Sequence, residues 1–99
     1  MVTPFDASGA VDYSLAAKVA QFLVEQGNDA LVVAGSTGEG SALTDEEKLE
    51  LFSVVASAVS VPVIAGTSSP DTAKSVALTA EASRRGIAGI LATTPSYVR

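Results

Sequence analysis

The 99-residue sequence contains no cysteine and no histidine, and these two absences exclude several kinds of chemistry. Without cysteine there is neither a disulfide bond nor a thiol nucleophile within the chain. Without histidine there is no His-based catalytic triad, and the ligands that most zinc and transition-metal sites use are missing. We therefore expect no bound metal.

Basic residues are also scarce: six lysines and arginines stand against eleven aspartates and glutamates, which gives a net charge of −5. No cluster of Lys or Arg could neutralise phosphates, which argues against nucleic acid and against an anionic membrane surface as partners. No apolar run reaches the roughly 18–20 residues that span a bilayer. The N-terminal residues MVTPFD lack the basic and apolar regions of a secretory signal, so we expect a cytoplasmic protein.

Three short apolar runs predict β-strands at residues 30–35 (ALVVAG), 61–66 (VPVIAG) and 89–94 (GILATT). Their hydrophobicity is continuous rather than alternating, which is typical of strands covered on both faces. Pro62 has no N–H to donate to a ladder, so we place it at the first residue of its strand. Residues 2–5 could be the end of an earlier strand.

Segments with helical periodicity separate these runs, and in each one the apolar residues recur at spacings of three and four. Such a stripe predicts the face of the helix that packs on the sheet. The three predicted stripes are Leu15, Val19, Phe22 and Leu23; Leu51, Val55, Ala58 and Val59; and Ala73, Val76, Ala77 and Ala80.

Capping residues mark where these helices begin and end. Asp12 is expected to cap the first helix, with Gly27 just past its end, and residues 44–47 (TDEE) form a capping box for the second. Residues 69–70 (SP) read as N-cap and first position of the third helix. Residues 84–86 (RRG) read as its basic last turn and the glycine beyond.

Strands that recur at intervals of about 30 residues, each separated by one helix, predict an α/β fold with a parallel sheet. The pattern alone leaves a closed barrel and an open doubly wound sheet as alternatives. About three and a half βα units make half of a (β/α)8 barrel, which needs at least about 200 residues. The sequence stops just past a predicted strand, so we expect residues 1–99 to be a partial domain that lacks its C-terminal half.

Hydroxyl residues follow each predicted strand, at the edge of the sheet where ligands bind in α/β folds. They lie in residues 35–40 (GSTGEG), 66–69 (GTSS) and 93–97 (TTPSY). The first of these loops lacks the Gly-Lys-Ser/Thr ending of a P-loop, and the charge of Glu39 would repel phosphate. A carboxylate suits its hydroxyl and backbone donors better. A plain turn, with Ser36 and Thr37 bonded to local backbone, remains open on spacing alone.

Tyr97 and the lysines are the other candidates for chemistry. The phenol of Tyr97 suits proton transfer, although an aromatic residue beyond a strand end more often serves packing. Lys18, Lys48 and Lys74 all fall on predicted helices, where we expect each to be solvated. A Schiff-base lysine needs burial or a cationic neighbour to lose its proton near neutral pH, so none of the three is a good nucleophile.

Four segments in register resemble the dihydrodipicolinate synthase / N-acetylneuraminate lyase family of pyruvate-dependent class I aldolases. These segments are VTPF at 2–5, GSTGEG followed by LTDEEK at 35–48, PVIAGT at 62–67 and TTPSY at 93–97. Each motif is weak alone, but the four together run through the whole chain in order. The resemblance implies that the chain is the N-terminal part of a (β/α)8 TIM barrel.

The resemblance also implies a reaction. Family members form a Schiff base between pyruvate and a lysine on the sixth strand, and the resulting enamine attacks an aldehyde without any cofactor. By this resemblance, Thr37 binds the pyruvate carboxylate, and Ser36 both contacts the substrate and relays a proton. Tyr97 completes the relay in a neighbouring subunit, across the dimer interface of a homotetramer built as a dimer of dimers.

Two residues depart from the pattern of the synthases. Ser96 replaces the first tyrosine of the family's T-P-Y-Y segment, and Ser36 stands where threonine is more usual. Serine keeps the hydroxyl but loses the methyl group that restricts its rotamer. Serine also occurs there in the sialic acid lyases, so the loop does not decide the second substrate. Glu39 receives no role.

The opening VTPFDASGAVD and the alanine-rich acidic helices look most like the bacterial synthases, which condense pyruvate with L-aspartate 4-semialdehyde in lysine biosynthesis. Another pyruvate aldolase of the family, acting on a sialic or keto-deoxy sugar acid, is the alternative within this chemistry. A non-catalytic half-barrel that serves binding or assembly is a further alternative. Because the Schiff-base lysine would lie beyond Arg99, we expect the chain alone to be inactive.

Overall fold

A three-stranded parallel sheet forms the centre of the computed structural model, which describes residues 1–94. Strands β1 (Leu31–Val33), β2 (Val63–Gly66) and β3 (Gly89–Leu91) lie in the order β1-β2-β3, with Val33 opposite Ala65 and Ala65 opposite Ile90. The three predicted strands are confirmed, each shorter than its apolar run. Pro62 lies just before β2 rather than in it, and its carbonyl accepts the Leu31 N–H at 3.0 Å.

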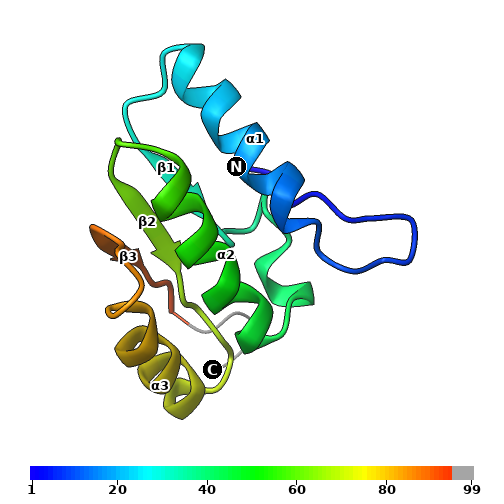
Figure 1. Cartoon of the computed structure of the whole chain (residues 1–99). Helices are drawn as coiled ribbons and strands as arrows, with labels where there is room; N and C mark the ends of the chain where they lie inside the picture. Colours follow the sequence, from blue (N-terminus) through cyan, green and yellow to red (C-terminus); the bar gives the residue numbers. More distant parts are fainter. Residues whose placement is uncertain (95–99) are drawn as a thin grey trace.

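Residues 2–5 form no strand, so this part of the prediction is wrong. Within residues 1–94 their single bridge joins Phe5 and Val11 in antiparallel fashion. Pro4 has no N–H, and the chain turns back on itself immediately afterwards, which leaves no length for a ladder. The turn is fastened by the Asp6 carboxylate, which accepts the N–H groups of Ser8 and Ala10. Figure 1 shows this loop standing away from the helices and strands.

Helix α1 (Tyr13–Glu25) begins where its cap was predicted, because the Asp12 carboxylate accepts the Leu15 N–H at 2.9 Å. Gly27 follows its end with a φ of 106°, a conformation that glycine adopts without strain. The predicted apolar face is only partly right. Ala16 and Ala20 are the fully buried residues of α1, whereas Leu15 and Phe22 are exposed.

Helix α2 (Asp45–Ala58) begins at the predicted capping box, and it buries the predicted face. The Thr44 hydroxyl accepts the Glu47 N–H at 3.1 Å, and the Glu47 carboxylate accepts the Thr44 N–H at 2.8 Å, which completes the capping box. Leu51, Phe52 and Val55 have no exposed surface and form the centre of the hydrophobic core. Figure 1 shows α2 between α1 and α3, and it contacts both β1 and β2.

Helix α3 (Thr72–Ala82) starts two residues later than predicted, because its cap is Asp71 and not Ser69. The Asp71 carboxylate accepts the N–H groups of Ala73 and Lys74, a stronger capping interaction than a serine hydroxyl offers. The predicted stripe is also wrong: its members are exposed, and α3 instead buries Leu78 and Ala82. Alanines occur all around this helix, so the two faces differ too little in hydrophobicity for the sequence to identify the buried one.

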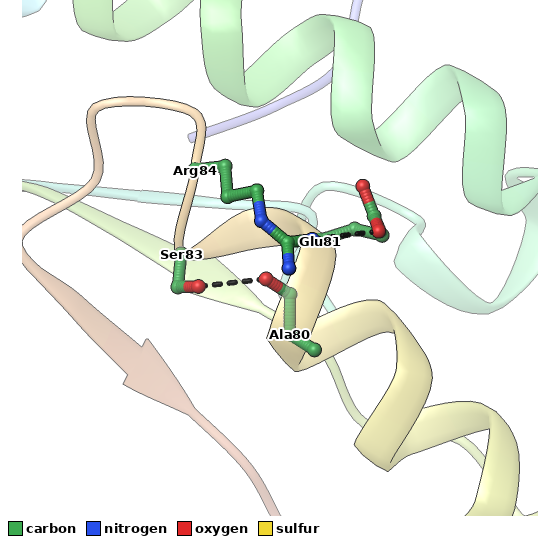
Figure 2. Close-up of polar contacts among 4 residues, drawn as sticks. All are labelled: Ala80, Glu81, Ser83 and Arg84. Atoms are coloured by element: carbon green, nitrogen blue, oxygen red, sulfur yellow. Dashed lines mark hydrogen bonds and ion pairs between the residues drawn. The ribbon is translucent and has the colours of Figure 1, made fainter.

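The end of α3 lies before the two arginines that were predicted to form its last turn. The Ser83 hydroxyl donates to the Ala80 carbonyl at 2.6 Å, and Arg84 pairs with Glu81 at 2.8 Å (Figure 2). The chain then turns at Gly86, which has a φ of 79°. The ion pair is exposed, so it contributes at most about 1 kcal/mol to the free energy of unfolding.

The helices cover one face of the sheet. Leu31, Val33, Val63 and Ala65 point toward that face and are at most 3% exposed, whereas the alternate residues Val32 and Ile64 are half-buried. The prediction that the strands are covered on both faces is therefore wrong for the described residues. Consecutive parallel strands joined by right-handed crossovers place their helices on the same face, as in a barrel and unlike a doubly wound sheet.

We predict that Thr44→Ala lowers the free energy of unfolding by about 1 kcal/mol, because it removes the oxygen that accepts the Glu47 N–H. Urea denaturation of the purified chain measures this. Thr72→Ala is the matched control, since the Thr72 side chain has no hydrogen bond within residues 1–94 and its loss should change stability by less than about 0.5 kcal/mol. Equal losses in the two variants would contradict a role for the capping box.

Candidate functional site

The loop after β1 starts with a strained residue held in place by two glycines. Ala34 is buried and has a φ of 59°, the left-handed conformation that costs a residue with a side chain about 1 kcal/mol or more. Its carbonyl packs directly against Gly40 and Gly66, and a β-carbon at either position would overlap the Ala34 carbonyl. These glycines therefore bring the ends of β1 and β2 closer than any other residue would allow.

Backbone hydrogen bonds then shape residues 35–40 into a fixed loop. The Gly40 N–H donates to the Gly35 carbonyl at 3.0 Å, and the Glu39 N–H donates to the Ser36 carbonyl at 3.1 Å. The buried Thr3 hydroxyl donates to the Gly38 carbonyl at 2.6 Å. Glu39 adopts a φ of 57° and precedes the short 3-10 helix η1 (Gly40–Ala42). The loop is thus tied to the N-terminal segment and is more than a loose turn.

The hydroxyls of Ser36 and Thr37 are exposed and make no hydrogen bond to any residue between 1 and 94. Within the described residues, these hydroxyls therefore do not bond to local backbone, which was the alternative left open by the sequence. The N–H groups of Ser36, Thr37 and Gly38 also lack an acceptor in this part of the chain. Up to five donors are grouped over three residues, a chemical environment suited to a small anion.

Two cavities meet at this loop. The smaller has a volume of about 180 Å³ and is lined by Ser36, Thr37 and Gly38 together with Met1, Val32, Gly35 and Leu91. The larger, of about 460 Å³, also touches Gly35, Ser36 and Leu91, and extends over the hydroxyls that follow β2 and β3. Ser36 lies at the boundary between them. No charged side chain lines either cavity within the described residues.

The three predicted hydroxyl segments come together at one edge of the sheet, as far as the structure describes them. The Ser68 hydroxyl accepts the Thr93 N–H at 2.8 Å and shares a second hydrogen bond of 3.1 Å with the Thr93 hydroxyl. These bonds join the loops that follow β2 and β3. Ser96 and Tyr97 lie outside the described residues, so the predicted relay tyrosine has no position here.

Ser41 and the Ser68–Thr93 pair are features that sequence reasoning did not single out. Ser41 lies on η1 and lines the larger cavity. The signal available in the sequence was the repetition of hydroxyls after each strand, which predicts a shared edge but not which pairs meet. The role of Ala34 was also missed, because alanine carries no sequence signal for a left-handed conformation.

One of the three lysines differs from its prediction. Lys48 is only 5% exposed, so the expectation that all three are solvated is wrong for this residue. It lies on α2 between the acidic first turn and Leu51, and its amine is not a buried group that lacks a hydrogen-bond partner. Lys48 lines neither cavity, and neither do Lys18 and Lys74.

Burial lowers the pKa of the α-amino group of Met1, a residue that lines the smaller cavity and donates to the Val32 carbonyl at 2.6 Å. The other two shifted groups lie away from the cavities. Hydrogen bonds from the hydroxyl and N–H of Ser8 lower the pKa of the exposed Asp6 carboxyl. Burial, assisted by the charges of Glu47 and Glu50, raises the pKa of the Tyr13 phenol. Residues 1–94 hold no group of three or more acidic side chains placed to bind a metal ion, and none of their helices is long and apolar enough to cross a membrane.

Comparison with known proteins places this geometry in a family. The sequence model of the dihydrodipicolinate synthetase family matches residues 1–99, the whole chain. The chain belongs to this family. A 4-hydroxy-tetrahydrodipicolinate synthase from Symbiobacterium thermophilum is 50% identical to it over an alignment of 99 residues, and the match covers 98% of this chain and 34% of that protein.

Solved structures of family members share the fold. A dihydrodipicolinate synthase from Bacillus anthracis is 43% identical with a TM-score of 0.93, over 98% of this chain and 34% of that one. An N-acetylneuraminate lyase from Proteus mirabilis is 26% identical with a TM-score of 0.93, over 100% of this chain and 34% of that one. The fold class predicted from the sequence, the N-terminal portion of a (β/α)8 barrel, is confirmed. The chain spans about a third of the length of these relatives.

We predict that Gly66→Ala destabilises the chain by about 1–3 kcal/mol, because the new methyl group collides with the Ala34 carbonyl and forces the two loops apart. Gly89→Ala is the matched control on the neighbouring strand, where the nearest atom to an added β-carbon is Ile64 Cγ1 at 3.9 Å. Thermal unfolding of both variants measures the difference. If Gly66→Ala is as stable as Gly89→Ala, the close approach of Ala34 is not a constraint.

Proposed function

We propose that this chain provides the pyruvate-binding loop of a lyase that condenses pyruvate with L-aspartate 4-semialdehyde in lysine biosynthesis. The observation that carries the proposal is that Ser36, Thr37 and Gly38 line the smaller cavity and that their donors have no partner among residues 1–94. The name of the Symbiobacterium thermophilum relative supports the reaction, and the loop geometry supports the first substrate. A cytoplasmic enzyme without a cofactor fits this proposal.

In the proposed site, Thr37 binds the pyruvate carboxylate. Thr37 is exposed and lines a cavity of about 180 Å³, which is of the size of a three-carbon acid with a few waters. Hydroxyl and N–H donors can hold a carboxylate by charge-assisted hydrogen bonds without a lysine or arginine. The absence of a charged side chain from the described lining and the nearby charge of Glu39 make phosphate a poorer ligand.

Ser36 is the proposed substrate contact and proton relay. It lies where the two cavities meet, so its hydroxyl can contact a group bound in the smaller one and pass a proton toward the larger one. A serine hydroxyl both donates and accepts, which a relay requires. We propose that Tyr97 of a neighbouring subunit takes the next position in the relay, within a homotetramer built as a dimer of dimers.

The Schiff-base lysine of the proposed reaction lies outside these 99 residues. In that step a neutral lysine amine attacks the pyruvate carbonyl, water leaves, and the enamine formed by proton loss attacks the aldehyde carbon. Lys18, Lys48 and Lys74 lie on helices and line neither cavity, so none of them suits this role. We propose that residues 1–99 are a partial barrel domain whose remaining units supply the lysine.

A sialic or keto-deoxy sugar acid aldolase is the second candidate within the family. The similarity to the Proteus mirabilis lyase favours it, as does the serine at position 36. The identity of 26% to that lyase against 43% to the Bacillus anthracis synthase favours the synthase. A non-catalytic half-barrel that serves binding or assembly stays a third candidate, and pyruvate binding separates it from the other two.

We predict that pyruvate shifts the amide resonances of residues 35–39 in an NMR titration of the chain, and that Thr37→Val weakens this binding about ten-fold or more. Loss of one hydrogen bond to a charged group accounts for an effect of this size. Thr72→Val, on the exposed start of α3, is the matched control and should bind like the unmodified chain. Tighter binding of inorganic phosphate than of pyruvate would contradict the carboxylate assignment.

We also predict that the 99-residue chain neither turns over pyruvate and L-aspartate 4-semialdehyde nor gains a pyruvate adduct on borohydride reduction. Mass spectrometry detects such an adduct on a single lysine. Covalent capture at Lys48, the one buried lysine, would show that the reactive amine lies within this chain and that its assignment elsewhere is wrong. A longer protein that contains the chain should be labelled once per subunit.

A further inference from the structure

The buried side chain of Thr3 connects the N-terminal segment to the loop of residues 35–40. Thr3 is 6% exposed, and its hydroxyl donates to the Gly38 carbonyl at 2.6 Å although 35 positions separate the two residues in the sequence. Gly38 lines the smaller cavity, whereas Thr3 lines neither cavity. Any effect of Thr3 on a bound ligand must therefore pass through Gly38.

The peptide group between Gly38 and Glu39 is held on both sides. Its carbonyl accepts the Thr3 hydroxyl, and its N–H donates to the Ser36 carbonyl at 3.1 Å. Glu39 has a φ of 57°, a left-handed conformation that a residue with a side chain seldom adopts. Rotation of this peptide group by half a turn would give Glu39 a negative φ and relieve the strain. The two hydrogen bonds oppose that rotation.

The rotated peptide group would disrupt the candidate site. Its N–H and C=O would exchange directions, so the Gly38 carbonyl oxygen would lie opposite the Ser36 carbonyl oxygen. Two carbonyl oxygens repel each other, and the turn of residues 36–39 would open. A carboxylate held only by uncharged donors needs several of them in fixed positions at once, because no single one supplies a full charge. Loss of the Thr3 hydrogen bond would therefore weaken the binding of an anion that Thr3 never contacts.

Thr3 can resist this rotation because its own segment is fixed. The carbonyl of Pro4 accepts the N–H of Asp12, the residue that caps α1, at 3.0 Å. Gly38 also packs closely on the same segment, since an added β-carbon there would lie 2.8 Å from the Met1 carbonyl oxygen and 3.3 Å from Thr3 Oγ1. The start of α1 thus supports the loop through two residues.

We infer that Thr3 is a positioning residue for the carboxylate site: it holds the peptide group between Gly38 and Glu39 in the orientation in which the loop binds pyruvate. The identity of the ligand rests on the proposed function. The action of Thr3 on the loop does not depend on it and is measured separately.

Three substitutions test the inference. Thr3→Val removes the donor and keeps nearly the same shape, whereas Thr3→Ser keeps the hydroxyl. Thr79→Val is the matched control, because the Thr79 hydroxyl donates to the buried Thr67 hydroxyl at 2.8 Å and has no hydrogen bond to residues 35–40 within the described chain. Circular dichroism and urea denaturation show that each variant folds, and Thr3→Ala replaces Thr3→Val if the latter does not.

The first measurement is amide hydrogen exchange at Glu39 without pyruvate. Thr3→Val should speed this exchange about ten-fold, whereas Thr3→Ser and Thr79→Val should stay within about three-fold of the unmodified chain. The second measurement is the pyruvate titration of residues 35–39 by NMR. Thr3→Val should raise the Kd about ten-fold, and the other two variants should bind like the unmodified chain.

A general loss of stability would affect Thr3→Val and Thr79→Val alike. Equal changes in Glu39 exchange in these two variants, or unchanged pyruvate affinity in Thr3→Val, would therefore overturn the inference. Failure of Thr3→Ser to restore slow exchange would also overturn it. If the unmodified chain does not bind pyruvate while Glu39 exchange responds as expected, the proposed function is contradicted and the action of Thr3 on the loop is supported.

Discussion

The close approach of the Ala34 carbonyl to Gly40 and Gly66 is the constraint on which the candidate site depends. It fixes where β1 ends, how the loop of residues 35–40 leaves the strand, and how near the end of β2 lies. The strain of a left-handed alanine is offset by the surrounding core, because Leu43, Val33 and Ala65 are buried beside it. Ser36, Thr37 and Gly38 line the smaller cavity, and their N–H groups and hydroxyls have no hydrogen-bond partner among the described residues.

The site is built almost wholly from hydroxyl and backbone groups, and this limits its chemistry. Such donors bind and orient a carboxylate, but an uncharged hydroxyl does not form a Schiff base. In the proposed function, the described residues therefore supply recognition of the first substrate, and the covalent chemistry comes from an amine elsewhere. This division agrees with a chain that covers a third of the length of its relatives.

The face of the sheet away from the helices bears on this division. A parallel sheet is stable when both faces are covered, and here the face of Val32 and Ile64 is only half-buried. The smaller cavity opens on the same face, since Val32 and Leu91 belong to its lining. The smaller cavity therefore lies at the face of the sheet that the described helices leave uncovered.

Local chemistry in the sequence determined the fold class, the number of strands and helices, the capping of α1 and α2, and the edge at which the hydroxyls gather. Each of these follows from interactions between residues close in the chain, such as Asp12 with Leu15 or Thr44 with Glu47. Only the tertiary structure decided which face of α1 and α3 is buried, that Lys48 is covered, that Ala34 is left-handed, and that Ser68 meets Thr93. Those features depend on contacts between segments distant in sequence, where packing overrides the weak preference of an alanine-rich helix or a single residue.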